Sequence, residues 1–480
     1  MMLHTLFPFS KYPVLSVLVC MILWCILQGN ASASLSIEDE KKLGKEFYEK
    51  LQKENLLLPG ERANAYITLL GKHVLSHSEQ APFDFHFSII RSSAINAFAT
   101  PGGYVYINQG LINLVESEAE LASVIAHEIA HVNGRHIAEI VDKQTKLSIS
   151  TLAAILAGAF LGGSGDASAA VASFSLAAAT TLSLKYSRDH EESADRAGLS
   201  YLVDSGYPGR SMLDFMKIMK RYEFYSNTIP SYFLTHPGTD ERIHYIDSLL
   251  QTTIAPGGKA EIIGNLKRIQ VILLLDTKKP DVNLPFFQKK LKEHPADPDF
   301  LYGLAVTQER AGMTPEAFES FRKALALTPD DPDILRDLGI ALYKQGKFDE
   351  AARNLRRAVT LREDDRDSSL HLGKTLVAQE KMTDALRLYK NLEAKHPADP
   401  DIQYPLAVIY GKTGQTGDSH YYFGLYFKKM GKADSSLFHF KAALKHHPPD
   451  HPRAVEIKKE IETIEKDRRH RPQTHRPGPG

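Results

Sequence analysis

Residues 118–141, EAELASVIAHEIAHVNGRHIAEIV, are the stretch from which the rest of this chain can be interpreted. The stretch is rich in Ala, Leu, Ile and Glu and contains no Pro, which predicts a helix. Residues four apart lie on one face of a helix, so His127 and His131 can bind one metal ion from a single rigid element. Glu128 is turned about 100° from His127, where it can act as a general base on a water activated by that metal.

A catalytic zinc ion usually has three protein ligands, so one more ligand must come from elsewhere in the chain. Residues 186–199, YSRDHEESADRAGL, predict a second helix with capping residues near its start. Glu191 and Asp195 share a face of that helix, so one carboxylate can bind zinc while the other supports a histidine ligand. Glu192 is a rival ligand, but it points about 100° away from Glu191. An acidic, solvated helix face is the simpler alternative.

His136 is the other histidine of the first stretch. It follows His131 by five positions, which turns it about 140° from the ligand face of a continuous helix. The zinc motif of the metzincins would need a histidine at Ile137, so that pattern is absent. We therefore expect His136 to have a packing or surface role.

Several stretches resemble the M48 family of zinc metallopeptidases. The resemblance includes residues 127–136 and 187–195 and the Thr-His-Pro…Arg-Ile element at 235–243. Residues 96–107, NAFATPGGYVYI, resemble the strand hairpin that precedes the family's zinc helix. The likeness covers residues 35–250. With the repeats described below, the chain resembles the periplasmic β-barrel assembly-enhancing proteases of that family.

The resemblance assigns roles to five residues around one Zn²⁺ per chain. It implies that His127, His131 and Glu191 are the zinc ligands and that Glu128 is the general base. It also implies that Asp195 is the carboxylate behind a histidine ligand.

Two residues of the 235–243 element also receive roles from the resemblance. His236 matches a histidine on a mobile loop that can take the fourth position at zinc and hold the enzyme latent. Arg242 matches an arginine near the site, which suggests an oxyanion stabiliser. The plain alternative for His236 is a loop boundary, because a His-Pro pair often begins or ends a loop.

Gly103, Tyr104, Val105 and Tyr106 alternate like a strand after a flexible turn. We expect them to form a sheet edge beside the site, to which an extended substrate adds as a further strand. That mode recognises backbone rather than side chains, and it would suit unfolded or misassembled β-rich polypeptides.

The first 33 residues predict a signal peptide. Lys11 precedes an apolar stretch over 13–27, and residues 31–33, ASA, offer a cleavage site. The stretch is short for a membrane span. Both cysteines, Cys20 and Cys25, lie in this segment, so cysteine usage says nothing about the compartment. Export to the periplasm is predicted from the signal alone.

A second apolar zone covers residues 147–184 and is interrupted at 162–166, GGSGD. Each arm is shorter or more polar than a span of about 20 residues. We expect a helical hairpin that packs beside the site or touches a membrane surface. A spanning hairpin, in an integral membrane protease, is the alternative.

From about residue 298 the chain repeats every 34 residues, which is the tetratricopeptide period. A small residue occupies the same slot in four copies: Ala305, Gly339, Gly373 and Gly424. A single-helix segment at 401–417 shifts the phase before the last copy, and residues 261–295 resemble a degenerate helical pair. Such arrays form a solenoid whose concave face binds extended or helical segments. The resemblance implies docking to the outer-membrane β-barrel assembly machinery or to its unfinished clients.

These observations predict a mostly α-helical chain with four parts. They are a signal peptide (1–33), an α+β zinc protease domain with a small sheet (34–258), an α-solenoid of tetratricopeptide repeats (259–450) and a basic, disordered tail (451–480). The 58 basic and 58 acidic residues leave no net charge to attract nucleic acid.

The resemblance implies an exported zinc metalloendopeptidase, associated with the outer membrane, that degrades misfolded or misassembled envelope proteins and assists outer-membrane protein assembly. The alternative is a largely latent protease that acts as a periplasmic chaperone or assembly factor through its repeats.

Overall fold

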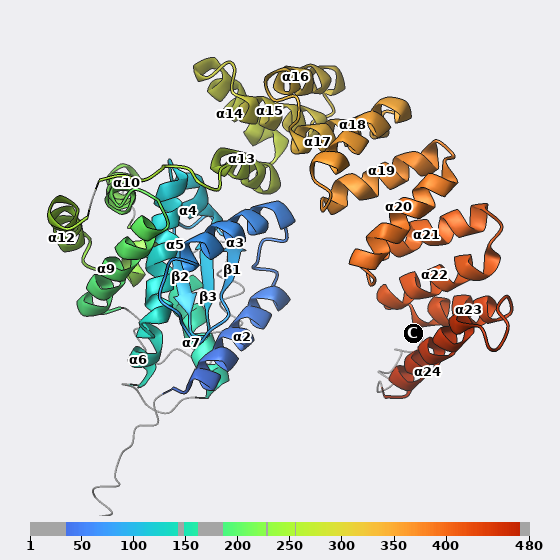
Figure 1. Ribbon diagram of the computed structural model, residues 1–480, viewed down its shortest axis with the longest axis horizontal. Helices are drawn as coiled ribbons and strands as arrows, with labels where there is room; N and C mark the ends of the chain where they lie inside the picture. The colour runs from blue at the N-terminus through green and yellow to red at the C-terminus, as the bar shows by residue number, and fades with distance from the viewer. Residues whose placement is uncertain (1–34, 143–147, 162–185, 227–228, 255, 471–480) are drawn as a thin grey trace, which may run out of the picture. The chain divides into compact units, whose positions relative to one another are not determined.

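The computed structural model describes residues 35–142, 148–161, 186–226, 229–254 and 256–470. The chain divides into two compact units, residues 1–273 and 274–480. The first unit combines helices with a small sheet, and the elements described in the second are all helices (Figure 1). The predicted fold class is therefore confirmed. The predicted signal peptide lies outside the described residues.

The sheet of the first unit has three short strands, β1 (His86–Ile90), β2 (Ala97–Thr100) and β3 (Tyr104–Asn108), in the order β1-β3-β2. β3 pairs parallel with β1 and antiparallel with β2. The predicted hairpin is thus present as β2 and β3. Its turn contains Gly102 and Gly103 at φ values of 85° and 94°, where a side chain would be strained.

The expectation that residues 103–106 form a substrate-binding edge is wrong. β3 is the central strand, so its backbone groups are already bonded to β1 and β2. On the outer side of β1, the carbonyl of Ile89 accepts from the N–H of Leu58. Within the described ranges, the outer edge of β2 is the one without a backbone partner.

The helices of the first unit surround α5 (Glu118–Asn133), which is buried along nearly its whole length. Ser117 caps α5 and forms a capping box with Glu120, which fixes where the helix begins. α5 packs against β2 on one side and against α9 and α10 on others (Figure 1). The other helices are α2 (Ile37–Lys53), α3 (Glu61–Leu75), α4 (Gln109–Leu114), α6 (His136–Asp142), α7 (Ile149–Leu161), α9 (Arg188–Asp204), α10 (Arg210–Ser226), α11 (Ser231–Thr235) and α12 (Thr239–Thr252).

α7 is the first arm of the second apolar zone. It packs against α2, and its Phe160 ring stacks on Phe98 of β2 with centroids 4.5 Å apart. This arm therefore packs within the first unit, whereas residues 162–185 lie outside the described part of the chain. No helix in the described ranges combines the length and apolar character needed to cross a membrane.

The helices of the repeat region confirm the predicted pairing of small and large residues. A Cβ atom at Gly339, Gly373 or Gly424 would lie 2.6, 2.6 or 2.5 Å from the side chains of Leu355, Tyr389 and Phe440 respectively. Glycine therefore lets the two helices of each pair approach closely. α13 (Leu266–Thr277) contains the boundary between the two units. The helices that follow it are α14 (Pro280–Glu293), α15 (Pro298–Arg310), α16 (Thr314–Leu327), α17 (Pro332–Lys344), α18 (Phe348–Leu361), α19 (Arg366–Ala378), α20 (Met382–Lys395), α21 (Pro400–Lys412), α22 (Thr416–Lys429), α23 (Ala433–Leu444) and α24 (Pro452–His470).

The expectation of a disordered tail from residue 451 is wrong for residues 452–470. They form α24, which packs on α23 and buries Ala454, Ile457 and Ile464. These apolar residues recur at helical spacing, so the segment can bury one face despite its many charges. The remainder of the predicted tail lies beyond the described residues.

Glu118, the first residue of α5, anchors the segment that leads out of the first unit. Five donors bond its buried carboxylate at 2.7–3.0 Å: the N–H groups of Ile262, Ile263 and Gly264 and the hydroxyls of Tyr66 and Tyr207. Burial alone would raise the pKa of Glu118, but these hydrogen bonds hold it below its ordinary value. Glu118 thereby ties residues 262–264 to the start of α5.

We expect Glu118→Gln to lower the free energy of unfolding by roughly 3 kcal/mol at pH 7, since each buried donor left without an acceptor costs about 1–3 kcal/mol. Because the folded-state pKa is depressed, this stabilisation is complete above the unfolded pKa of about 4.3 and is lost as the pH falls through the folded value. Denaturant unfolding at pH 7 and below pH 4 measures both effects. Glu116→Gln, at an exposed neighbour, is the control. Equal midpoints for the two variants would contradict the anchoring role.

Candidate metal centre

Four side chains that could hold a metal ion converge inside the first unit. His127 and His131 come from α5 and Glu191 from α9. His236 directly follows α11 and caps its C-terminal end. One donor atom from each lies within 4.8 Å of the others, and all four residues are buried. The structure thus brings together all four predicted ligands, although 109 positions separate His127 from His236.

The donor atoms are close enough to share one cation. Nε2 of His127 lies 2.9 Å from Nε2 of His131 and 3.3 Å from Nδ1 of His236. Nδ1 of His236 is 3.0 Å from Oε1 of Glu191. Imidazole nitrogens and a carboxylate oxygen facing one point are the donor set that zinc prefers, so these residues fit a divalent cation.

Glu128 lies beside this cluster and is fully buried. Within the described chain, neither carboxylate oxygen accepts a hydrogen bond, and Oε1 is 3.5 Å from Nε2 of His236. Burial raises the pKa of Glu128 above its ordinary value. A buried carboxylate with a raised pKa and free acceptor capacity is suited to taking up a proton.

Asp195 and Arg242 support the cluster from behind. Oδ1 of Asp195 is 2.9 Å from Nδ1 of His127, the ring nitrogen turned away from the metal position. Arg242 donates to both oxygens of Asp195, each at 2.7 Å, and forms an ion pair with Glu191. The structure thus places Asp195 against the far nitrogen of His127, where the sequence analysis expects it. The oxyanion role expected for Arg242 does not fit, because its guanidinium is occupied by these two carboxylates.

The same contacts set the protonation of the cluster. Burial disfavours a charged imidazole, but Asp195 and Glu191 raise the pKa of His127 to about 9. Burial disfavours a charged carboxylate, but His236 and Arg242 hold the pKa of Glu191 well below its ordinary value. Because a metal binds the neutral imidazole, loading the site would release a proton from His127.

His136 supports His131 in a way that the sequence did not predict. Its Nδ1 lies 2.9 Å from Nδ1 of His131, and its ring stacks on that of His190 with centroids 4.7 Å apart. The 140° estimate assumed a continuous helix. In the structure α5 ends at Asn133, Arg135 adopts a φ of 53°, and α6 begins at His136. This break turns the buried His136 back toward His131, although His136 is not one of the four converging donors.

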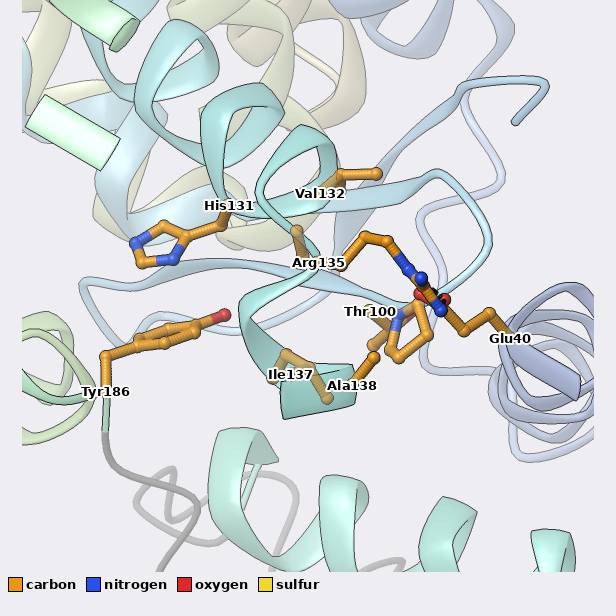
Figure 2. A pocket seen from close by; sticks show the side chains of 10 residues that line it. Glu40, Thr100, His131, Val132, Arg135, Ile137, Ala138 and Tyr186 are labelled. Carbon is orange, nitrogen blue, oxygen red and sulfur yellow. Dashed lines mark hydrogen bonds and ion pairs between the residues drawn. The ribbon is translucent and has the colours of Figure 1, made fainter. Parts of the chain in front are cut away.

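Tyr186 is a second residue that the sequence analysis did not single out. Its ring stacks on the imidazole of His131 (3.8 Å between centroids) and on that of His236 (5.1 Å). Tyr186 and His131 line a small pocket that Ala99 and Thr100 of β2 also line (Figure 2). Tyr186 directly precedes Ser187, the residue that caps α9. That position is the one local signal from which Tyr186 could have been identified as a residue of the site.

Family comparisons match both parts of the chain. The model described as peptidase family M48 matches residues 61–250. Models described as tetratricopeptide repeat and TPR repeat match residues 336–400 and 311–346.

Curated proteins from two bacteria are similar to part of the chain. A putative beta-barrel assembly-enhancing protease of Vibrio cholerae is 32% identical over 282 residues, which is 58% of this chain and 58% of that protein. The beta-barrel assembly-enhancing protease of Escherichia coli is 32% identical over 215 residues, 45% of this chain and 44% of that protein. The chain therefore spans about half the length of the curated relatives it matches.

Among solved structures, pilF of Pseudomonas aeruginosa is 20% identical to this chain. The match covers 40% of this chain and 96% of that structure, with a TM-score of 0.32.

Proposed function

We propose that this chain is a zinc-dependent metalloendopeptidase, because residues 61–250 match the model of peptidase family M48 and tetratricopeptide repeats follow them. The observation that carries the proposal is the convergence of four buried donors from α5, α9 and α11 beside the buried Glu128. Metal analysis of the purified chain, with turnover of casein or misfolded porin by wild type and by Glu128→Gln, tests it.

In this proposal His127, His131 and Glu191 hold one Zn²⁺ per chain. When bound, zinc supplies a Lewis acid that polarises a carbonyl and lowers the pKa of water. Asp195 fixes the ring orientation of His127 through the 2.9 Å contact at Nδ1. Arg242 in turn holds Asp195 and Glu191 in place through its ion pairs.

Glu128 is the general base and acid of the proposed reaction. It takes a proton from the water that attacks the scissile carbonyl carbon. It then gives this proton to the departing amine as the C–N bond breaks. Its two oxygens, which accept no hydrogen bond within the described chain, leave room for both transfers.

The position of His236 favours a gated enzyme. Its imidazole lies 3.0 Å from Glu191 and 3.3 Å from His127, in the place where a reacting water or carbonyl would have to enter. In this arrangement His236 is a fourth ligand that holds the site latent. Movement of the loop after α11 would open it.

We expect His236→Ala to raise turnover of an unstructured substrate roughly fivefold or more, within the range of ordinary coupling energies. The reason is that the variant removes the competing ligand while His127, His131 and Glu191 remain. Turnover per bound zinc is the quantity to measure, so that altered metal content is separated from altered gating. Unchanged or lower turnover would argue for a structural or catalytic role of His236 instead.

For the whole chain, the proposal is an exported periplasmic protease, associated with the outer membrane, that acts on misfolded or misassembled envelope proteins. The repeats would bind polypeptide clients or the β-barrel assembly machinery, and α7 would allow peripheral membrane contact. The names of the relatives and the solenoid support this reading. Cell fractionation, and N-terminal sequencing for a start at residue 34, test export. Recovery of the chain solely from the cytoplasm with its first residues intact would contradict it.

The second candidate function is a largely latent protease that acts as an assembly factor through its repeats. The burial of His236 among the metal donors favours it. If the chain is an assembly factor, the Glu128→Gln variant keeps its cellular function. If the chain acts as a protease, the same variant loses that function.

A further inference from the structure

The hydroxyl of Tyr186 is a buried donor that no described contact explains. Tyr186 is 2% exposed, and its oxygen has no hydrogen-bond partner within the described residues. A buried polar group without a partner costs about 1–3 kcal/mol, so such groups in native proteins require a reason.

The ring of Tyr186 holds this hydroxyl in a defined place. It stacks on His131 at 3.8 Å and 30°, and on His236 at 5.1 Å and 29°. The rings of His136 and His190 also contact it edge-on, each with its centroid 6.5 Å away. Figure 2 shows the hydroxyl pointing away from the backbone of Tyr186 and into the space between His131 and Ile137.

The space in front of the hydroxyl is part of the pocket that contains the metal-site residue His131. Its lining combines apolar residues such as Ala99 and Ile137 with the ion-paired Glu40 and Arg135. Because the Tyr186 hydroxyl is itself withdrawn from solvent, a hydrogen bond from it to a developing negative charge is stronger than in water. Arg242 directs an N–H group from each of its three guanidinium nitrogens at Asp195 or Glu191, so the buried hydroxyl of Tyr186 is the donor without a described partner.

We propose that Tyr186 is a catalytic residue that donates a hydrogen bond from its hydroxyl to the oxyanion of the tetrahedral intermediate. The inference rests on the proposed peptidase function. Water adds to the carbonyl carbon and its proton passes to Glu128, while the carbonyl oxygen becomes the oxyanion that Tyr186 stabilises. The phenol keeps its proton throughout. When the C–N bond breaks, the oxyanion returns to a carbonyl and the amine receives the proton from Glu128.

Tyr186→Phe separates this role from a structural one, because phenylalanine keeps the ring stacked on His131 and removes only the donor. In the full-length zinc-loaded chain we expect kcat to fall about 10²–10³-fold, with KM within about threefold of wild type and zinc content unchanged. Affinity for a phosphinic peptide, which mimics the tetrahedral species, should fall by a similar factor, while affinity for the product peptide stays the same.

Tyr106→Phe is the matched control. It removes a hydroxyl that is buried in the sheet beside Phe47 and Phe98 on a residue that does not line the pocket, and it should leave kcat unchanged. Wild-type kcat in Tyr186→Phe would overturn the inference, as would a lower zinc content or a higher KM at constant kcat. Absence of turnover in the zinc-loaded wild type would instead contradict the proposed function, and phosphinate affinity would still decide the role of the hydroxyl.

Discussion

Glu128→Gln is expected to lower peptide turnover about 10²–10⁴-fold, the usual contribution of a positioned acid–base group. The amide has almost the same shape as the carboxylate but cannot take up the proton of the attacking water. Zinc content should stay at the wild-type level, because Glu128 is not among the four converging donors. Stopped-time peptide assays together with metal analysis on the same preparation measure both quantities.

Two outcomes would count against this role of Glu128. Turnover within a factor of ten of wild type would show that another group transfers the proton. Loss of zinc in Glu128→Gln would show that the residue binds the metal. Wild-type and variant chains should also unfold at the same denaturant concentration, which confirms that a loss of turnover is chemical.

The largest effect on the metal itself is expected from Glu191→Gln. It replaces the one anionic donor of the cluster and leaves Arg242 without one of its two carboxylate partners. We expect zinc affinity to fall more than about 100-fold, beyond the 10–100-fold typical of residues that only support a ligand. Competition with a chelator of known affinity measures the change.

Two neighbouring carboxylates on α9 provide matched controls. Asp195→Asn should lower zinc affinity by only about 10–100-fold, because Asp195 contacts His127 and not the metal position. Glu192→Gln should change nothing, because Glu192 is exposed and paired with Arg196. Equal zinc affinity in wild type and Glu191→Gln, or a larger loss in Glu192→Gln, would overturn the proposed ligand set.

Much of the metal centre could be predicted because its key spacings are local. His127 and His131 lie one helical turn apart on α5, and Glu191 and Asp195 lie one turn apart on α9. The period of the α-helix places each pair on a common face regardless of the remainder of the fold. The same argument holds for the repeats, in which Gly339 and Gly373 are spaced by the 34-residue period and lie against Leu355 and Tyr389.

Three predictions that needed more than a regular helical or strand spacing were incomplete or wrong. Alternation identified β3 as a strand, but only the pairing with β1 and β2 shows that it is central. The rotation argument for His136 failed because the backbone of Arg135 breaks the helix. Likewise, the sequence did not show that Arg242 would form ion pairs with Asp195 and Glu191.

The sequence by itself determined the helix that carries His127 and His131, the helix that carries Glu191, and the repeat array, because covalent spacing and helical period set these within a few turns of chain. Only the tertiary structure decided that His236 reaches the metal donors, that Tyr186 directs an unpaired hydroxyl into the pocket, and that Glu118 anchors the segment at 262–264. Such contacts join residues far apart in the chain. They arise from the packing of whole elements, which no local pattern encodes.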